Sequence, residues 1–161
     1  MRYKWSLLIG YADSSDLHEW KNKGPALIDY KGYAEGPHVF HWKGCYWMLL
    51  DSMLPEYTAG GGLAVFRSKD ATHWEYQDGI LGDKGTRNQD SNADHCSVAL
   101  QGNRAFLLYH TNSGGQSVGQ LAELLCKDGV LSATRDVKPM KLEASKAPAF
   151  RGGGAPDFAK E

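Results

Sequence analysis

One short stretch of the chain carries a side chain suited to acid–base chemistry. Glu35 stands directly before Gly36 and Pro37. Proline has a fixed φ and restricts the residue before it, so we expect the backbone that carries Glu35 to be extended and stiff. A carboxyl group held in this way suits a general acid, which must be positioned before it can donate a proton. The alternative is that Glu35-Gly36-Pro37 is an ordinary turn into a strand.

A second polar stretch leads into an apolar run that starts after His95. Arg87, Asp90 and Asp94 lie in this stretch, directly before that histidine. Charged residues in a loop at the mouth of a strand could line a substrate pocket, and a solvated connector is the alternative. The second stretch is therefore a further candidate part of a polar site.

The residues after Glu35 predict the element that would position it. Residues 39–42 and 45–50 are rich in aromatic and apolar side chains, and Lys43-Gly44 lies between them. Two such runs separated by a two-residue turn with glycine predict a β-hairpin. Glu35 would then lie at the entry of the first strand, and Asp51 would follow the second strand as a cap on its turn.

The sequence also repeats itself. The pattern S-x-D-x-x-x-W occurs from Ser14 to Trp20 and again, 54 residues later, from Ser68 to Trp74. Residues 98–109 repeat the strand, glycine turn and strand of the hairpin around Gly44, at an offset of 58. A period of about 55 residues with four short strands in each copy predicts the blades of a β-propeller. A β-sandwich is the alternative all-β architecture, but it does not predict such a period.

The blades do not add up to a closed ring. Within a partial propeller domain of residues 1–146, residues 35–81 and 93–135 each supply one blade, and residues 1–34 supply only an outer half-blade. Residues 147–161 read as a flexible tail or arm. Propellers close with about four to eight blades. The sequence therefore predicts a fragment of a longer chain or an association of copies, most simply a homodimer.

Charge and cysteine content limit the classes of partner. The formal net charge is −1, with 18 basic and 19 acidic residues, so no basic field indicates nucleic acid or an anionic membrane surface. Cys45, Cys96 and Cys126 read as buried free thiols, which is typical of a reducing compartment. We find no signal peptide and no membrane-spanning segment, so we expect a cytoplasmic protein. The spacing of histidines and cysteines predicts no metal site, and we expect no cofactor.

Several motifs together resemble a known family. The chain is similar to the five-bladed β-propeller glycoside hydrolases of family 43 and their relatives in families 32 and 117. The resemblance covers nearly all of residues 5–135, and the S-x-D-x-x-x-W turns are part of it. The other segments that carry it are Glu35-Gly36-Pro37-His38-Val39-Phe40, Lys43-Gly44-Cys45-Tyr46-Trp47-Met48, and Asp94-His95-Cys96-Ser97-Val98 with the later Tyr109-His110.

The resemblance implies roles for particular residues. It implies that Glu35 is the general acid and that His95 lies at the floor of the active site. Such enzymes use two further aspartates from earlier blades, and no strand-opening Asp-Pro motif precedes Glu35. Asp90, Asp94 or a second subunit would have to supply the missing base.

Several residues are expected to bind the substrate, and of these only His95 follows from the resemblance. A neutral partner and an aromatic-rich chain fit a carbohydrate substrate, on which an exposed aromatic ring can stack. We expect His38, Arg87, His95 and Trp42 to contact it, although His38 could equally have a packing role. The predicted function is hydrolysis of glycosidic bonds in oligo- or polysaccharides. The alternative is a non-catalytic carbohydrate-binding or scaffold protein that has lost the base.

Overall fold

The structure is a computed structural model that describes residues 9–27, 34–52, 62–83 and 92–138. These residues form strands and no helix, which confirms the all-β class, and none of them forms a helix able to cross a membrane. The strands are β1 (Gly10–Asp13), β2 (Lys21–Pro25), β3 (Ala34–Trp42), β4 (Cys45–Ser52), β5 (Leu63–Ser68), β6 (Glu75–Ile80), β7 (Asp94–Gln101), β8 (Arg104–Ser113), β9 (Gln116–Lys127) and β10 (Val130–Thr134).

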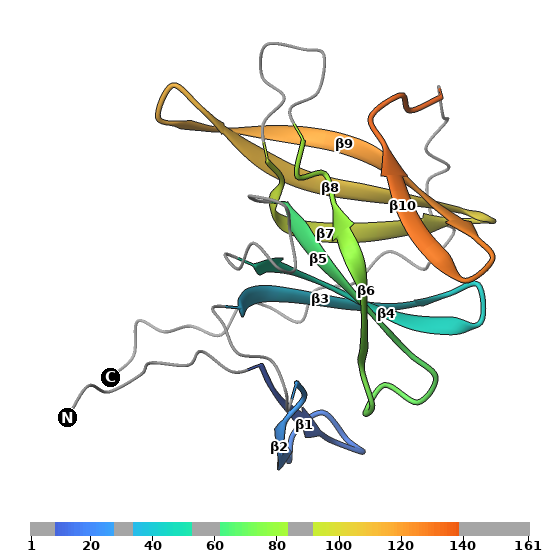
Figure 1. Cartoon of the computed structure of the whole chain (residues 1–161). Helices are drawn as coiled ribbons and strands as arrows, with labels where there is room; N and C mark the ends of the chain where they lie inside the picture. Colours follow the sequence, from blue (N-terminus) through green and yellow to red (C-terminus); the bar gives the residue numbers. More distant parts are fainter. Residues whose placement is uncertain (1–8, 28–33, 53–61, 84–91, 139–161) are drawn as a thin grey trace, which may run out of the picture.

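The strands form three antiparallel sheets. β1 and β2 make a two-stranded sheet, β3 to β6 make a four-stranded sheet in chain order, and β7 to β10 make a second four-stranded sheet. Figure 1 shows the sheets in the order of the chain, with β3–β6 between the β1–β2 hairpin and β7–β10. We call the two larger ones the first sheet (β3–β6) and the second sheet (β7–β10).

The first hairpin forms where the aromatic runs predict it. Trp42 pairs with Cys45, and the two turn residues Lys43 and Gly44 have φ values of 53° and 77°. Two consecutive positive φ values are what a tight hairpin turn needs to match the twist of its strands. The register of the hairpin places Glu35 opposite Asp51 at the other end of the two strands.

The first sheet is covered on both faces. One face packs on the second sheet through a core that includes Trp47, Leu49, Leu107 and Leu124. The other face packs against residues next to β1 and β2 through Met48, Leu50, Phe66, Ala26 and Leu27. Burying each large apolar side chain contributes about 1.5–3 kcal/mol, so these two cores hold the strand entries in place.

Hydrogen bonds also link the two four-stranded sheets. The Gln77 side-chain amide donates to the Leu131 carbonyl at 3.0 Å and accepts from the Leu131 N–H at 2.7 Å. The backbone N–H of Val98 donates to Nε2 of His38 at 3.1 Å. The first pair joins the outer strands β6 and β10, and the second joins the inner strands β3 and β7.

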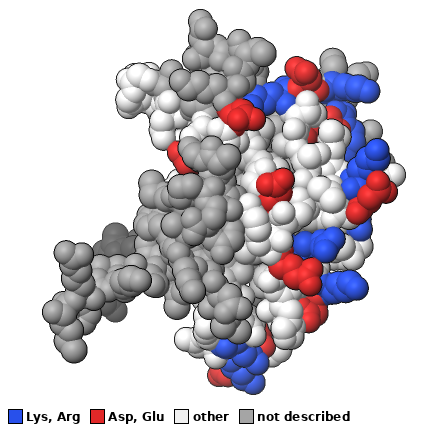
Figure 2. Space-filling view, viewed as in Figure 1, with Lys and Arg blue, Asp and Glu red and all other residues white. Residues whose placement is uncertain are grey.

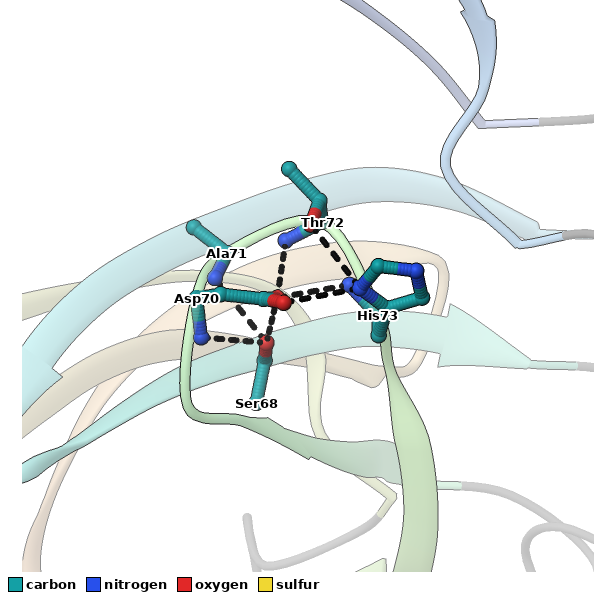
Figure 3. A network of polar contacts seen from close by, with 5 residues as sticks. All are labelled: Ser68, Asp70, Ala71, Thr72 and His73. Carbon is teal, nitrogen blue, oxygen red and sulfur yellow. Dashed lines mark hydrogen bonds and ion pairs between the residues drawn. The ribbon is translucent and has the colours of Figure 1, made fainter.

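The turn between β5 and β6 is closed by the side chains of the repeated motif (Figure 3). Ser68 Oγ accepts from the backbone N–H groups of Asp70 and Ala71, and Asp70 Oδ1 accepts from those of Thr72 and His73. The hydrogen bonds that the Asp70 carboxylate accepts from the backbone N–H of His73, from His73 Nδ1 and from the backbone N–H of Thr72 hold its pKa far below the usual range. Carboxylate oxygens that accept local backbone N–H groups are a common way to close a turn.

The turn between β1 and β2 has the same hydrogen bonds. Ser14 Oγ accepts from the N–H of Leu17 at 2.8 Å, and Asp16 Oδ1 accepts from the N–H groups of His18 and Glu19 at 2.9 Å. The two turns differ in their tryptophans, because Trp20 is 59% exposed whereas Trp74 packs beside the core. The tryptophan of the motif therefore packs beside the core only in the second turn.

Candidate functional site

The entries of β3 and β7 have the same backbone arrangement. Glu35 pairs with Asp51 on β4, and Asp94 pairs with His110 on β8. In each pair of strands the register then shifts, between Glu35 and His38 and between Asp94 and Ser97. Such bulges commonly redirect side chains near the ends of strands and next to active sites.

This register corrects the sequence offset. Equivalent positions of the inner strands lie 59 residues apart (35 and 94, 51 and 110), not 58. The residue equivalent to Glu35 is therefore Asp94, and the residue equivalent to His95 is Gly36. The one-residue difference arises because the glycine of the second hairpin turn, Gly102, takes the first turn position whereas Gly44 takes the second.

Gly36 and His95 both have left-handed backbone conformations, with φ values of 57° and 39°. Glycine adopts a positive φ without strain, but a histidine there is uncommon. A Cβ atom on Gly36 would lie 2.7 Å from Nδ1 of His95, so the missing side chain at position 36 leaves the space that the imidazole occupies. The two equivalent residues therefore fit against each other across the two sheets.

Asp51 accepts hydrogen bonds from the backbone of His95 and lies beside its ring. The backbone N–H of His95 donates to both carboxylate oxygens of Asp51, at 2.9 and 3.1 Å. His95 Nδ1 lies 2.8 Å from Oδ2 of Asp51. Among the described residues Asp51 is the one buried carboxylate, with 6% of its surface exposed. Buried carboxylates are retained where such partners compensate for lost water.

The electrostatics of the site act on Asp51. Burial raises the pKa of its carboxyl group above the usual value, and the negative charges of Asp94 and Glu35 act in the same direction. The hydrogen bond from the His95 N–H and the charge of the His95 ring oppose this rise in pKa. The carboxylates of Glu35 and Asp94 therefore lie close enough to Asp51 for their charges to raise its pKa.

Glu35, Asp51 and His95 form a compact cluster. One ligand-type atom from each lies within 4.8 Å of the corresponding atoms of the other two. The side chain of His95 is 54% exposed, and its ring centroid lies 5.5 Å from that of His110. The cluster thus combines the buried carboxylate of Asp51 with the half-exposed imidazole of His95.

Asp94 is held at the edge of this cluster by polar partners. The side-chain amide of Asn112 donates to Asp94 Oδ2 at 3.1 Å, and the Ser117 hydroxyl donates to Asn112 Oδ1 at 3.3 Å. A side-chain amide that donates to a carboxylate oxygen fixes the orientation of the carboxylate. The structure therefore brings three predicted site residues together, namely Glu35, Asp94 and His95.

The other predicted site residues lie elsewhere. Trp42 is buried in the core at the opposite end of β3 from Glu35. Nε2 of His38 accepts the Val98 N–H, and burial lowers the pKa of the His38 imidazole, so this nitrogen serves the contact between sheets. Arg87 and Asp90 lie outside the described residues.

Sequence reasoning missed Asp51 as a member of the site. The pairing of Trp42 with Cys45 fixes the register of the hairpin, and in that register the position opposite Glu35 is 51 or 52, depending on the bulge. The predicted hairpin therefore already indicated that residue 51 or 52 lies opposite Glu35. The contact with His95 could not be found in the same way, because it joins two sheets.

The cluster has the residue types of a metal site, but Asp51 and His95 are engaged with each other. Both oxygens of Asp51 accept the His95 N–H, and Oδ2 also meets the His95 ring. We therefore assign no metal to it. A hollow of about 460 Å³ lies at the other end of the first sheet, lined by Cys45, Arg67, Ser68, Lys69, Asp70, His73 and Glu75, and it is separate from the cluster.

The charged surface shows no patch of one sign on the face drawn in Figure 2. Lysine and arginine side chains there alternate with aspartate and glutamate side chains. A nucleic-acid interface needs clustered positive charge to meet the phosphate backbone. The described part of this face carries no such cluster.

Known structures of similar fold are glycoside hydrolases. A thermostable family-43 glycoside hydrolase superposes with a TM-score of 0.59 and 24% identity, and the match covers 78% of this chain and 47% of that one. A family 117 glycoside hydrolase from the marine bacterium Zobellia galactanivorans superposes with a TM-score of 0.61 and 17% identity, covering 79% and 41%. No protein-family model and no curated protein matches the sequence.

These likenesses establish the fold. The chain is a partial β-propeller of the glycoside hydrolase type, and the similarity to that group predicted from the sequence motifs is confirmed at the level of structure. The chain spans less than half of the length of the two structures described above. At such identities, the residue roles must be argued from the site itself.

Proposed function

We propose that the protein is a glycoside hydrolase-like protein that cleaves glycosidic bonds in oligo- or polysaccharides, with Glu35 as the general acid. The observation that carries the proposal is the cluster of Glu35, Asp51 and His95 at the strand entries of a glycosidase-type propeller. Glycoside hydrolysis needs a carboxyl group beside the scissile bond and a second group that activates water. In this proposal Glu35 is the first group, and Asp94 at the edge of the cluster is a candidate for the second.

In the proposed reaction Glu35 gives its proton to the leaving oxygen as the bond to the anomeric carbon breaks. A water molecule attacks the same carbon and transfers a proton to a base. Asp94 is a candidate for this base, since its carboxylate is fixed by Asn112 close enough for its charge to act on Asp51. Asp90 and Arg87 remain predictions for the same pocket, as a second carboxylate and a substrate contact.

The test compares leaving groups. We expect Glu35→Gln to lower kcat/KM by about 10²–10⁴ on alkyl glycosides and far less on 4-nitrophenyl glycosides, because nitrophenolate leaves without a proton. Glu75→Gln is the matched control, since Glu75 is an exposed glutamate at the opposite end of the first sheet. Equal losses on both kinds of glycoside, or unchanged turnover, would contradict the role of Glu35.

One observation favours the second candidate, a carbohydrate-binding protein without turnover. The matches cover 47% and 41% of the two hydrolases described above, so more than half of each of those proteins lies outside the match. This candidate predicts chemical-shift changes at His95 and His110 on addition of oligosaccharides, with no release of reducing sugar over days. Release of reducing sugar that stops in Glu35→Gln would reject it.

A surface feature supports a homodimer. The outer face of the second sheet has half-exposed apolar residues, among them Leu108 and Leu125. Apolar sheet faces of this kind favour association. Light scattering at micromolar concentration should therefore give twice the mass of 17.7 kDa, and a monomer would reject the dimer.

The cytoplasm is the compartment we propose. Cys45, Cys96 and Cys126 are all free thiols, and burial raises the pKa of Cys96 to about 12, so this thiol stays protonated. Free cysteines suit a reducing environment. Mass spectrometry after alkylation of the freshly lysed native host should find all three cysteines reduced, and a disulfide would contradict this location.

A further inference from the structure

We propose that His38 is a positioning residue: while its ring is neutral it holds the entries of β3 and β7 together through the Val98 N–H, and protonation of the ring releases them. The tautomer and the loss of this hydrogen bond on protonation rest on geometry. That the release lowers activity rests on the proposed function, in which Glu35 on β3 acts with Asp94 on β7.

The hydrogen bond to Val98 shows where the proton of the ring lies. The backbone N–H of Val98 donates to Nε2 of His38 at 3.1 Å. A backbone N–H can only donate, so Nε2 accepts through its lone pair and the one proton of the neutral ring is on Nδ1. A protonated imidazole carries a hydrogen on each nitrogen and has no lone pair to offer. The hydrogen bond therefore exists only while the ring is neutral.

The hydrogen bond lies directly behind the cluster. After the bulge of β3, pairing with β4 resumes at His38, and after the bulge of β7, pairing with β8 resumes at Ser97, next to Val98. Glu35 and His95 each lie three residues before one end of the hydrogen bond. The bond thus joins the two strands at the points from which their entries lead to the site.

The folded protein favours the neutral ring. His38 is half-buried, and burial lowers the pKa of its imidazole below the ordinary value of 6.5. Protonation would place a charge on this half-buried ring and leave the Val98 N–H without its acceptor. Because the pKa is lowered on folding, the stability that the neutral ring contributes is complete above pH 6.5. It is lost as the pH falls to the lowered pKa of the folded protein.

Other titratable side chains lie on the facing sides of these strands, namely Glu35 on β3, Asp51 on β4, His95 and Cys96 on β7, and Tyr109 on β8. Negative charge on Glu35 or Asp51 would favour the protonated ring, so the lowered pKa of His38 comes from burial. The Cys96 thiol keeps its proton because burial raises its pKa to about 12. Loss of the hydrogen bond therefore follows protonation of His38 itself.

Release of the two strands would disturb the proposed reaction. The entries are also joined by the hydrogen bonds from the His95 N–H to Asp51 and by the fit of Gly36 against the His95 ring. Both contacts depend on the position of β7 just ahead of Val98. Because the proposed acid and base come from different sheets, a displacement of about 1 Å between them can lower the rate on the order of 10²-fold.

The closing experiment begins without substrate. Two-bond ¹H–¹⁵N NMR spectra of the labelled whole protein report the tautomer of each of the six histidines, and His38→Gln identifies the signal of His38. We expect the Nδ1–H form at neutral pH, and an upfield shift of the Val98 amide proton in step with the titration of the ring. His41→Gln, an exposed histidine on the same strand, should leave both unchanged.

Two NMR results would overturn the proposal. One is an Nε2–H form of His38 at neutral pH, and the other is a titration of the ring that leaves the Val98 amide proton where it was. Both are read from the wild type, so they stand even where a variant fails to fold. His38→Gln adds a further comparison, because its side-chain oxygen can accept the Val98 N–H and cannot be protonated at these pH values.

Kinetics on 4-nitrophenyl glycosides then connect the hydrogen bond with the reaction. We expect His38→Leu to lower kcat at least about tenfold at neutral pH, whereas His38→Gln should retain kcat and lose the fall in kcat that follows protonation of His38 in the wild type. An acid limb in His38→Gln identical to that of the wild type would overturn the positioning role. Absence of hydrolysis by the wild type would reject the proposed function, whereas the NMR result would still decide the pH-dependent hydrogen bond.

Discussion

The entries of β3 and β7 are two versions of one structure, and they divide the chemistry between them. Each has a carboxylate, then a residue with positive φ, then a bulge. In the first sheet the positive-φ residue is Gly36 and the opposite residue is Asp51. In the second sheet these are His95 and His110. The backbone is repeated while the side chains are not.

The difference teaches that the site belongs to the pair of entries rather than to either one. Asp51 of the first sheet binds His95 of the second, and Gly36 leaves space for the ring of that same histidine. A glycine at 95 would keep the backbone N–H for Asp51 but remove the ring beside it, and a histidine at 36 would collide with its counterpart. The asymmetry of the repeat is therefore what builds the cluster.

The faces of the two sheets also carry different side chains at equivalent positions. Trp47 and Leu49 of the first sheet are fully buried against the second sheet. Their equivalents 59 residues on are Phe106 and Leu108, on the opposite, outer face of the second sheet, where Leu108 is 50% exposed. Along β3, Phe40 and Trp42 correspond to Ala99 and Gln101. The second sheet therefore presents a less aromatic face than the first.

The largest predicted effect tests this contrast in burial. Leu49→Ala should lower the free energy of unfolding by about 2–5 kcal/mol, because it leaves a cavity in the core between the sheets. Leu108→Ala, at the equivalent position, should lower it by less than about 1.5 kcal/mol, because half of that side chain is already in water. Urea denaturation at a fixed protein concentration measures both. Equal losses would mean that the outer face of the second sheet is covered in solution.

The second prediction concerns the two positive-φ residues. Gly36→Ala should destabilise the protein by about 1–3 kcal/mol, since the new Cβ would be strained at a φ of 57° and would lie 2.7 Å from Nδ1 of His95. Part of this loss should disappear when His95→Ala is present, because the contact with the ring is then gone. A double-mutant cycle measures the coupling. Strictly additive changes would show that Gly36 does not make room for the imidazole.

The fold could be predicted from the sequence because its signals are local or repeated. The Lys43-Gly44 turn indicated the hairpin, and the two S-x-D-x-x-x-W motifs indicated outer strand pairs whose turns have matching hydrogen bonds. Local hydrogen bonds between residues two or three apart depend little on the rest of the chain. Their outcome is therefore visible in the sequence.

The site was only partly predictable because its contacts join distant strands. The family resemblance implied site roles for both Glu35 and His95, but the hydrogen bond between Asp51 and His95 spans 44 residues and two sheets. Trp42 was predicted to contact the substrate but is buried in the core. An aromatic residue gives the same sequence pattern whether it faces a sugar or the core. Burial decides between these outcomes, and burial depends on tertiary packing.

The third prediction uses the buried carboxylate of Asp51, which the second sheet lacks at the equivalent His110. The pKa of Asp51 in the folded protein is raised above its ordinary value of 3.8. Its contribution to stability is therefore present below that value and is lost as the pH rises through the folded pKa. Relative to wild type, Asp51→Asn should gain stability as the pH rises from about 4 towards neutrality. Urea denaturation across this range measures the difference, and a slope of opposite sign would mean that the pKa is lowered.

The smallest predicted effects compare the two turns that share the S-x-D motif. Ser68 is buried and accepts two backbone N–H groups, so Ser68→Ala should lower the free energy of unfolding by about 1 kcal/mol, or Tm by about 2–4 °C. Ser14 accepts the equivalent N–H groups in an exposed turn, where water can replace its hydroxyl. Ser14→Ala should therefore change the free energy by about 0.5 kcal/mol or less. Thermal unfolding of the two variants and of Ser15→Ala, a control at the variable second position of the motif, measures the contrast. A larger loss at Ser14 than at Ser68 would show that the half-blade turn is the more buried of the two in solution, as it would be if a second copy of the chain covered it.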